Sequence, residues 1–304
     1  MLIAIDHGNK QIKTAHKTYV SGIISSDTKP PFGENIIYYK NKYYTLSDKR
    51  LPYMRDKTEN DNFLILSLFG IAYEIEALNC YSDDEIIDIQ LAVGLPPAHF
   101  GSQYKKFETY FKNRGTIEFE AFGKPYSICI TDAVAFPQAY AAAIPILMKV
   151  RDLSKVTVID IGGFTADFLQ LKKGEFSLET CDSLENGVIL LYNDIIKKVN
   201  GDFDILMEES DIDSIIRGEN TDYPSIIVET IKNMAQKYID QLVGKLRERM
   251  IDLRIGKSVW VGGGSILLKR FIKECDKVEN CCFVDEINAN VRGYEILYSS
   301  EKRR

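Results

Sequence analysis

Two stretches of this chain decide its fold: residues 3–13 read IAIDHGNKQIK, and residues 158–168 read VIDIGGFTADF. Each is an apolar strand that ends in an aspartate, continues through small residues and returns to alternating hydrophobicity, which predicts a hairpin. Glycine at the tip of such a hairpin lets backbone N–H groups approach phosphate oxygens, and the aspartate before it can hold a hydrated Mg²⁺. Two such hairpins that face each other would clamp one nucleotide.

A third glycine cluster strengthens this interpretation. Residues 258–268 read SVWVGGGSILL, a short apolar strand followed by Gly262, Gly263 and Gly264 and by a serine that can cap a helix predicted over residues 266–275. Three consecutive glycines leave no side chain between the backbone and a flat ligand. One such cluster alone is weak evidence because strand–glycine turns are common, but three in this order favour a nucleotide site.

The three motifs resemble those of the actin, heat-shock chaperone and sugar kinase superfamily, in which two phosphate hairpins and an adenosine motif occur in this order. Residues 131–144 (TDAVAFPQAYAAAI) resemble the segment that connects the two domains. Residues 283–297 (FVDEINANVRGYEIL) contain an Asn-x-Arg-Gly stretch and resemble the end of the bacterial actin-like plasmid segregation proteins of the ParM and StbA type. A tyrosine-rich hairpin at residues 36–46 also fits this group. The resemblance therefore extends over nearly the whole chain.

The predicted fold is α/β, with two actin-like (RNase H-like) lobes around a central nucleotide cleft. Hairpins joined to a parallel strand by crossover helices occur twice, and the second copy starts near Val156. We expect domain I over residues 1–152 and domain II over residues 153–285, with a C-terminal helix over about 286–304 that packs back on domain I. Further helices are expected over residues 62–79, 136–150, 186–199, 203–217 and 223–253.

The first hairpin supplies one part of the expected site. By resemblance, Asp6 orients Mg²⁺ through water, and Gly8, Asn9 and Lys10 present backbone and side chain to the β-phosphate. An aspartate here is also a good turn former, and Lys10 is equally well a solvated turn lysine. His7 stands where a small or acidic residue is usual, and we expect its imidazole to pack or hydrogen bond, not to catalyse.

Asp160 in the second hairpin is the candidate for catalysis. The resemblance implies that it helps to hold Mg²⁺ and the attacking water, with Gly162, Gly163 and Thr165 along the γ-phosphate. Gln138, at the start of the connecting helix, matches a position where the superfamily places a Glu or Gln that positions water. A glutamine is too weak a base to take a proton, so it would orient water and support slow hydrolysis. Gln138 is also an ordinary polar residue for a helix start.

The adenosine side of the site is expected from three places. Gly262, Gly263 and Gly264 would admit the base and ribose, while Asn186 and Gly187 are carried over from the resemblance as ribose or phosphate contacts. Asp167 is either a nucleotide ligand or a solvent-facing strand residue. The helix over residues 223–253 is expected to supply a basic or acidic ribose contact, and the sequence does not show which side chain.

Composition narrows the classes of function. With 304 residues, 45% hydrophobic, a net charge of -6 and a pI of about 5.3, the chain can build two medium cores and offers no broad face for nucleic acid. No leader precedes the first strand, and the longest apolar stretch, residues 63–73, is too short to span a bilayer, so we expect a soluble cytoplasmic protein without membrane contact. The six cysteines show no metal-ligand spacing, and the nucleotide's Mg²⁺ is the only metal expected.

These observations favour a nucleotide-driven polymer. No acidic residue between the hairpins stands in a convincing phosphoryl-acceptor motif for a sugar kinase, and no substrate-binding lobe of a chaperone is expected. ATP or GTP would close the cleft, subunits would associate head to tail, and slow hydrolysis would weaken the contact. The sequence thus predicts a nucleotide-driven, filament-forming ATPase that associates with further copies of itself. The resemblance to the ParM- and StbA-type proteins implies an actin-like ATPase for plasmid or mobile-element DNA segregation, with a DNA-bound adaptor protein of the ParR type as a partner. A metabolite kinase and a non-polymerising regulatory ATPase of the same fold are the alternatives.

Overall fold

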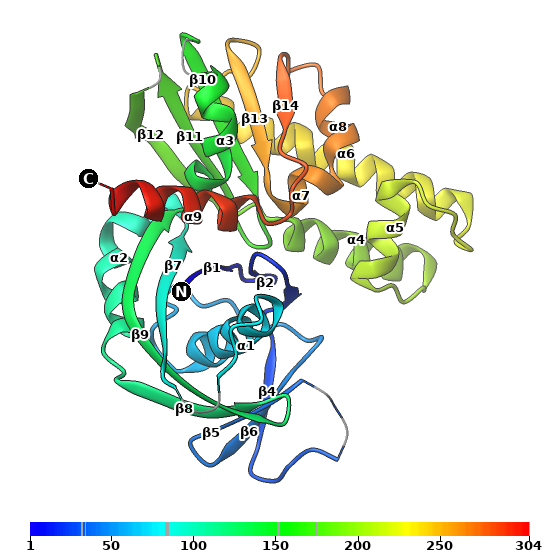
Figure 1. Ribbon diagram of the computed structural model, residues 1–304. Coiled ribbons are helices and arrows are strands. Elements are labelled where there is room, and N and C mark those ends of the chain that lie inside the picture. The colour runs from blue at the N-terminus through cyan, green and yellow to red at the C-terminus, as the bar shows by residue number, and fades with distance from the viewer. Residues whose placement is uncertain (32, 34, 83–84, 151–152, 174, 304) are drawn as a thin grey trace. The chain divides into compact units, whose positions relative to one another are not determined.

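The computed structural model describes residues 1–31, 33, 35–82, 85–150, 153–173 and 175–303 (Figure 1). This chain divides into two compact units. Unit 1 combines residues 1–142 with residues 288–304, and unit 2 comprises residues 143–287. The boundary falls within helix α3 (Tyr140–Val150). No helix among the described residues has both the length and the apolar character that a membrane span needs.

Unit 1 is built on a nine-stranded sheet in the order β3-β2-β1-β7-β9-β8-β5-β6-β4. Its strands are β1 (Leu2–His7), β2 (Gln11–Lys13), β3 (Thr18–Val20), β4 (Ile23–Ser26), β5 (Ile36–Tyr39), β6 (Lys42–Leu46), β7 (Ile87–Leu95), β8 (Thr116–Ala121) and β9 (Lys124–Pro137). The central strands β1, β7 and β9 run parallel, and hairpins extend the sheet on both sides. Parallel strands need cover on both faces, which explains their nearly continuous apolar sequence.

Alternation along β1 shows how the two faces of this sheet are covered. Ile3 and Ile5 belong to the core with helices α1 (Asn62–Ala77) and α2 (Pro97–Lys112), whereas Ala4 between them packs with helix α9 (Ala289–Glu301). The α9 face carries small residues: a Cβ at Gly94 would lie 1.8 Å from the Tyr294 hydroxyl. The C-terminal helix therefore packs directly on β1 and β7.

Unit 2 is built on a five-stranded sheet in the order β12-β11-β10-β13-β14. Its strands are β10 (Lys155–Ile161), β11 (Ala166–Lys172), β12 (Glu175–Leu184), β13 (Lys257–Val261) and β14 (Cys281–Phe283), and its further helices are α4 (Val188–Phe203), α5 (Glu209–Arg217), α6 (Ser225–Glu248), α7 (Gly262–Leu267) and α8 (Lys269–Glu274). Strands β10, β13 and β14 are parallel, while β10, β11 and β12 form an antiparallel meander. Trp260 on β13 is fully buried in the core that these elements share.

The connecting helix begins later than its sequence predicts. Strand β9 continues to Pro137, and α3 starts only at Tyr140. Gln138 and Ala139 form a turn between them, in which Ala139 adopts a left-handed φ of 61°. Few non-glycine residues take this conformation. The sequence around Ala139 therefore predicts a helix and gives no sign of the turn. The expected helix over residues 136–150 is thereby corrected to its second part.

Two helix starts in unit 2 also differ from the expectation. Helix α4 continues through Phe203, and the next helix begins at Glu209 because Glu208 and Asp211 exchange side-chain and backbone hydrogen bonds in a capping box. Ser265, expected to cap a helix after the glycines, lies inside α7, which starts at Gly262. The glycines are therefore the first turn of a helix, not an open loop before one.

Candidate functional site

The tip of the first hairpin is a tight turn at the end of β1. Strands β1 and β2 pair with His7 opposite Ile12, which leaves Gly8, Asn9 and Lys10 at the tip. A Cβ at Gly8 would lie 2.5 Å from the Gln11 carbonyl oxygen, so only glycine fits without a backbone shift. The tip residues are partly exposed and present their backbone at the surface of unit 1.

Asp6, the last buried carboxylate before this tip, accepts hydrogen bonds from two carboxamide side chains. Asp6 is 3% exposed; Gln138 Nε2 donates to its Oδ1 at 2.7 Å and Asn290 Nδ2 to its Oδ2 at 3.4 Å. An ionised carboxylate only accepts, so the amide nitrogen of Gln138 must face it. The amide oxygen of Gln138 is then the atom available to accept a hydrogen bond from a water.

Asn290 was missed by the sequence reasoning as a site residue. Its Oδ1 accepts a hydrogen bond at 3.1 Å from the backbone nitrogen of Ala139, the residue with left-handed φ. One side chain thus holds both Asp6 and the turn that carries Gln138. The signal in the sequence was the Asn-x-Arg-Gly stretch. Its glycine is required by packing, because a Cβ at Gly293 would lie 2.0 Å from the Ala141 carbonyl oxygen.

His7 is part of the core, as its sequence context suggested. Its Nε2 lies 2.7 Å from the Ser67 hydroxyl, and its ring stacks against Phe111 and meets Phe107 edge-on. Burial, followed by the positive charge of Lys57, holds the pKa of His7 well below its usual value. The imidazole is therefore neutral at physiological pH and closed off from solvent.

The second hairpin packs its tip onto the start of helix α4. Gly162 N donates to Thr165 O at 2.8 Å, which closes the tip. The carbonyl oxygens of Gly162 and Gly163 accept hydrogen bonds of 3.0 Å from the first two backbone nitrogens of α4. A Cβ at Gly187 would lie 2.1 Å from the Gly163 oxygen, so this contact requires glycine. Within unit 2, the structure thus brings Gly162, Gly163, Thr165 and Gly187 together, while their contact with phosphate stays a prediction.

Two buried carboxylates face each other across this hairpin. Asp160, 6% exposed, is paired in register with Asp167, 4% exposed. The alternative that Asp167 is a solvent-facing strand residue is therefore wrong. Burial raises the pKa of the nearby Cys181 thiol to about 11, and the charges of Asp167 and Asp182 add to this effect.

Helix α6 contributes a lysine beside Asn186. Asn186 is 4% exposed, and its side-chain oxygen accepts a short hydrogen bond from the Lys245 ammonium. The Tyr238 hydroxyl, about two helical turns before Lys245, donates to the Asn186 carbonyl oxygen. Lys245 is thus a basic side chain of α6 that contacts Asn186, and the expected ribose contact from this helix stays a prediction.

The three glycines of the adenosine motif have different surroundings. Gly262 has a φ of 86°, and a Cβ there would lie 2.0 Å from Asp160 Oδ1. A Cβ at Gly264 would lie 2.5 Å from the Ile161 side chain. Around Gly263, by contrast, a Cβ would meet nothing within 4 Å. Gly262 and Gly264 are required by packing, while a side chain at Gly263 would extend into open space.

Each unit offers one buried carboxylate of the kind that a hydrated Mg²⁺ takes as a partner. Among the described residues, no group of three or more His, Cys, Asp or Glu side chains is placed to hold a metal alone. Unit 1 offers the buried carboxylate of Asp6, and unit 2 offers that of Asp160. Mg²⁺ prefers one or two carboxylates plus waters and phosphate oxygens, which is the chemistry available here.

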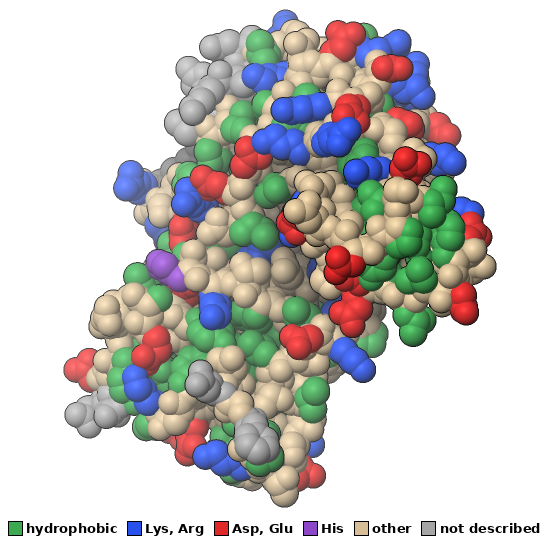
Figure 2. Space-filling model, turned by 90° about the vertical axis from the view of Figure 1, so that its right-hand side faces the viewer, with side chains coloured by type: hydrophobic (Ala, Val, Ile, Leu, Met, Phe, Trp, Pro, Cys, Tyr) green, Lys and Arg blue, Asp and Glu red, His purple; other side chains and the backbone are tan. Residues whose placement is uncertain are grey.

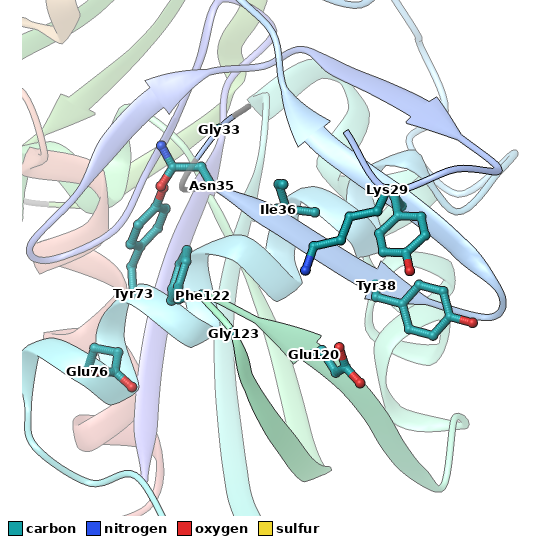
Figure 3. Close-up of a pocket in the computed structure, with 11 residues that line it drawn as sticks. Lys29, Gly33, Asn35, Ile36, Tyr38, Tyr73, Glu76, Glu120, Phe122 and Gly123 are labelled. Carbon is teal, nitrogen blue, oxygen red and sulfur yellow. The ribbon is translucent and has the colours of Figure 1, made fainter. Parts of the chain in front are cut away.

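Unit 1 also contains a cavity of about 560 Å³ (Figure 3). Two aromatic pairs contribute to its wall, Tyr38 with Tyr43 at 4.7 Å and Tyr73 with Phe122 at 4.9 Å between ring centroids. The other lining residues are Lys29, Gly33, Asn35, Ile36, Glu76, Glu120 and Gly123. None of the site residues predicted from the sequence lines this cavity, and the tyrosine-rich hairpin contributes Ile36, Tyr38 and Tyr43 to its wall.

Comparison with known proteins defines the class. Residues 4–140 match the family model for the N-terminal domain of actin-like proteins, and residues 158–274 match that for the C-terminal domain of the archaeal MreB-like actin homologue. A search of curated proteins returned no match. The two family matches follow each other along the chain and account for most of both units. The chain therefore belongs to the actin-like proteins.

Solved structures confirm the actin-like fold. The archaeal actin homolog Ta0583 matches with a TM-score of 0.80 and 16% identity over 99% of each chain, and another of its structures contains ADP. The actin-like protein Alp7A matches with a TM-score of 0.76 and 15% identity over 100% of this chain and 97% of its own. ParM from a 15-stranded Clostridium botulinum filament matches with a TM-score of 0.75 and 18% identity, over 98% of this chain and 99% of its own.

Proposed function

We propose that this protein is a nucleotide-dependent, filament-forming ATPase that moves plasmid or other mobile-element DNA. The observation that carries the proposal is the arrangement at Asp6, where Gln138 and Asn290 converge on one buried carboxylate beside a glycine turn. The second hairpin, with Asp160 and the open space at Gly263, supports binding of the same nucleotide. The ADP-containing structure of the similar archaeal protein is consistent with this ligand.

The residues would divide the work of hydrolysis. The backbone at Gly8, Asn9 and Lys10 and at Gly162 and Gly163 would bind the phosphates. A bound Mg²⁺ would neutralise phosphate charge, with Asp6 and Asp160 as its carboxylate partners. Gln138, with its amide nitrogen held by Asp6, would turn its oxygen toward a water and orient it without taking its proton. Positioning alone predicts slow turnover.

The adenosine end would lie in unit 2. Open space at Gly263 would admit the base or ribose, and Lys245, held by Asn186, would be the basic contact from α6. Thr165 and Gly187 would support the phosphate side of the same pocket through the hairpin contacts described above. ATP and GTP are both compatible with these contacts.

Self-association is the second half of the proposal. On unit 2 the loop and helix starts between α4 and α6 expose large apolar side chains: Leu206 is 85% exposed, Ile226 55% and Leu190 42%. Figure 2 shows hydrophobic side chains gathered on this side of unit 2. Exposed apolar surface of this kind commonly serves association. We assign it to contacts with further copies of this chain, and DNA attachment to an adaptor protein of the ParR type at the filament end.

Hydrolysis tests the assignment of the two catalytic residues. Asp160→Ala should lose nearly all phosphate release, because the carboxylate partner of the metal is gone. Gln138→Ala should lose about ten- to a thousandfold, the range for one positioning group, and should still bind nucleotide. Gln241→Ala, an exposed glutamine on α6, is the matched control and should hydrolyse like the wild type.

The outcome of this assay also separates the alternatives. An unchanged rate in Gln138→Ala would remove Gln138 from the mechanism. A wild-type protein that binds ATP but neither hydrolyses it nor scatters light would favour the metabolite kinase, to be tested with a panel of hydroxyl acceptors. Hydrolysis without any polymer would favour a regulatory ATPase of the same fold.

A further inference from the structure

A buried lysine stands behind the first phosphate turn. Lys57 is 4% exposed, and its ammonium donates a short hydrogen bond to the carbonyl oxygen of His7. Its nitrogen lies 5.4 Å from the centroid of the Phe63 ring. Lysine is rarely buried to this degree, because taking its charge out of water is costly unless a partner offsets the cost. The His7 carbonyl oxygen is one such partner of the Lys57 ammonium.

The carbonyl that Lys57 holds belongs to the peptide that leads into the turn. In a planar trans peptide the C=O and the following N–H point in opposite directions. The bond from Lys57 to the His7 oxygen therefore also fixes the direction of the Gly8 N–H, on the other side of the same peptide. That N–H is the first backbone donor of the turn to which we assign the phosphates.

The charge of Lys57 also acts on a second histidine, His99. Partial burial, followed by the charges of Arg55 and Lys57, lowers the pKa of His99 below its ordinary value. Asp56, the acidic neighbour of Lys57 in sequence, is engaged elsewhere: Lys106 donates to it at 2.5 Å.

We propose that Lys57 is a positioning residue for the nucleotide's phosphate chain, acting through the His7 carbonyl on the backbone donor of Gly8. This inference rests on the proposed nucleotide binding. It assigns to Lys57 a share in the recognition of phosphate and none in the recognition of the base or ribose. It also gives a physical reason for the buried ammonium, since the charge supports an anionic ligand one peptide away.

Binding measurements on two variants test the inference. Lys57→Met keeps the length of the side chain and its packing on Phe63, but removes the donor and the charge. We expect its affinity for ATP and for ADP to fall about ten- to a hundredfold, the loss typical of one charged hydrogen bond, while adenosine competes as well as in the wild type. Lys57→Arg should restore most of the affinity. Lys106→Met, on the exposed partner of Asp56, is the control for loop stability and should bind like the wild type.

Each result has a defined meaning. Selective loss of ATP and ADP affinity, with adenosine unchanged and partial rescue in Lys57→Arg, supports the inference. Equal ATP affinity in wild type and Lys57→Met, or a parallel loss for adenosine, overturns it, because the lysine would then be structural. Should Lys57→Met not fold, Lys57→Gln is measured with the same criteria. Failure of the wild type to bind any nucleotide overturns the proposed function itself.

Discussion

Gly263 differs from its two neighbours in the room around its α-carbon. Because a side chain there meets no protein atom within 4 Å, Gly263→Val should fold normally by circular dichroism and lose nucleotide binding by filling the open space. Gly264→Val should instead destabilise the fold, since its Cβ would collide with Ile161. Loss of structure in Gly263→Val would identify a purely structural glycine.

The control for this comparison is a glycine outside the site. Gly201 lies in α4, and a Cβ there also meets nothing within 4 Å. Gly201→Ala should bind nucleotide normally and gain up to about 1 kcal/mol of stability, because alanine favours the helix. Equal effects of the Gly201 and Gly263 substitutions on binding would contradict the assigned pocket.

Asn290 gives a second prediction at the level of single residues. Asn290→Ala removes the hydrogen bonds to Asp6 and to the Ala139 nitrogen, so the turn that carries Gln138 loses its support. We expect hydrolysis to fall about ten- to a hundredfold, as for other residues that orient a catalytic group. Combined with Gln138→Ala, the loss should be less than the product of the two single losses, because both act on one water.

Strict additivity of the two substitutions would show that Asn290 acts independently of Gln138. Phosphate release under single-turnover conditions is the suitable measurement, since it separates hydrolysis from nucleotide binding. Apo-protein melting curves for both variants serve as the control for folding.

The sequence indicated some of these residues and could not indicate others. Aspartates and glycines at strand ends carry a local signal, and the structure brings Asp6 together with Gln138, and Asp160 together with the glycines of unit 2. Asn290 and Asp6 are separated by 284 positions, and the partnership of Lys245 with Asn186 likewise depends on the folded arrangement. Their roles in nucleotide binding stay predictions.

At the scale of elements, the docking of α9 on the sheet depends partly on one carboxylate. Asp132 on β9 accepts a hydrogen bond of 2.8 Å from Tyr298 and pairs with Lys302 at 2.9 Å and Lys112 at 3.1 Å. Burial alone would raise the pKa of Asp132, but hydrogen bonds from Lys302, Tyr298 and Lys112 outweigh it and lower the pKa to about 2.

This shift predicts how stability depends on pH. Because the folded-state pKa lies below the ordinary value of 3.8, the contribution of Asp132 is present above that value and disappears as the pH falls toward about 2. Asp132→Asn should therefore cost about 1 kcal/mol at pH 7 and progressively less between pH 4 and pH 2. Urea denaturation of both proteins across this range measures the difference, and a constant difference would refute the assignment.

Elements were predictable where their pattern is local. Strands β1, β7 and β10 follow from apolar runs, and α1 from its long apolar segment, within two residues at its end. The start of α3 was not predictable, because the turn at Gln138 and Ala139 is held by a hydrogen bond to Asn290 on α9. The start of α5 had a signal in Glu208 and Asp211, but glutamate is an unusual first member of a capping box.

At the scale of the whole molecule, the proposed function requires that nucleotide state be coupled to association. Head-to-tail contacts with a rotation that does not close produce a filament. A nucleotide can drive assembly only if it favours the conformation that associates over the one that does not. The C. botulinum ParM to which this chain is similar in fold was solved as such a filament, which makes polymerisation the decisive test of the proposal.

The last prediction follows from slow hydrolysis by a positioned water. Gln138→Ala should assemble with ATP like the wild type, since binding survives, yet disassemble much more slowly, because the switch to weak contacts requires loss of the γ-phosphate. Light scattering after ATP addition, followed by pelleting over time, measures both rates, and a non-hydrolysable analogue should make the two proteins alike. If neither protein pellets with ATP, GTP or the analogue well above about micromolar concentration, the proposed filament is wrong. The protein should then be tested for phosphoryl transfer to an acceptor and for ATPase activity without polymerisation.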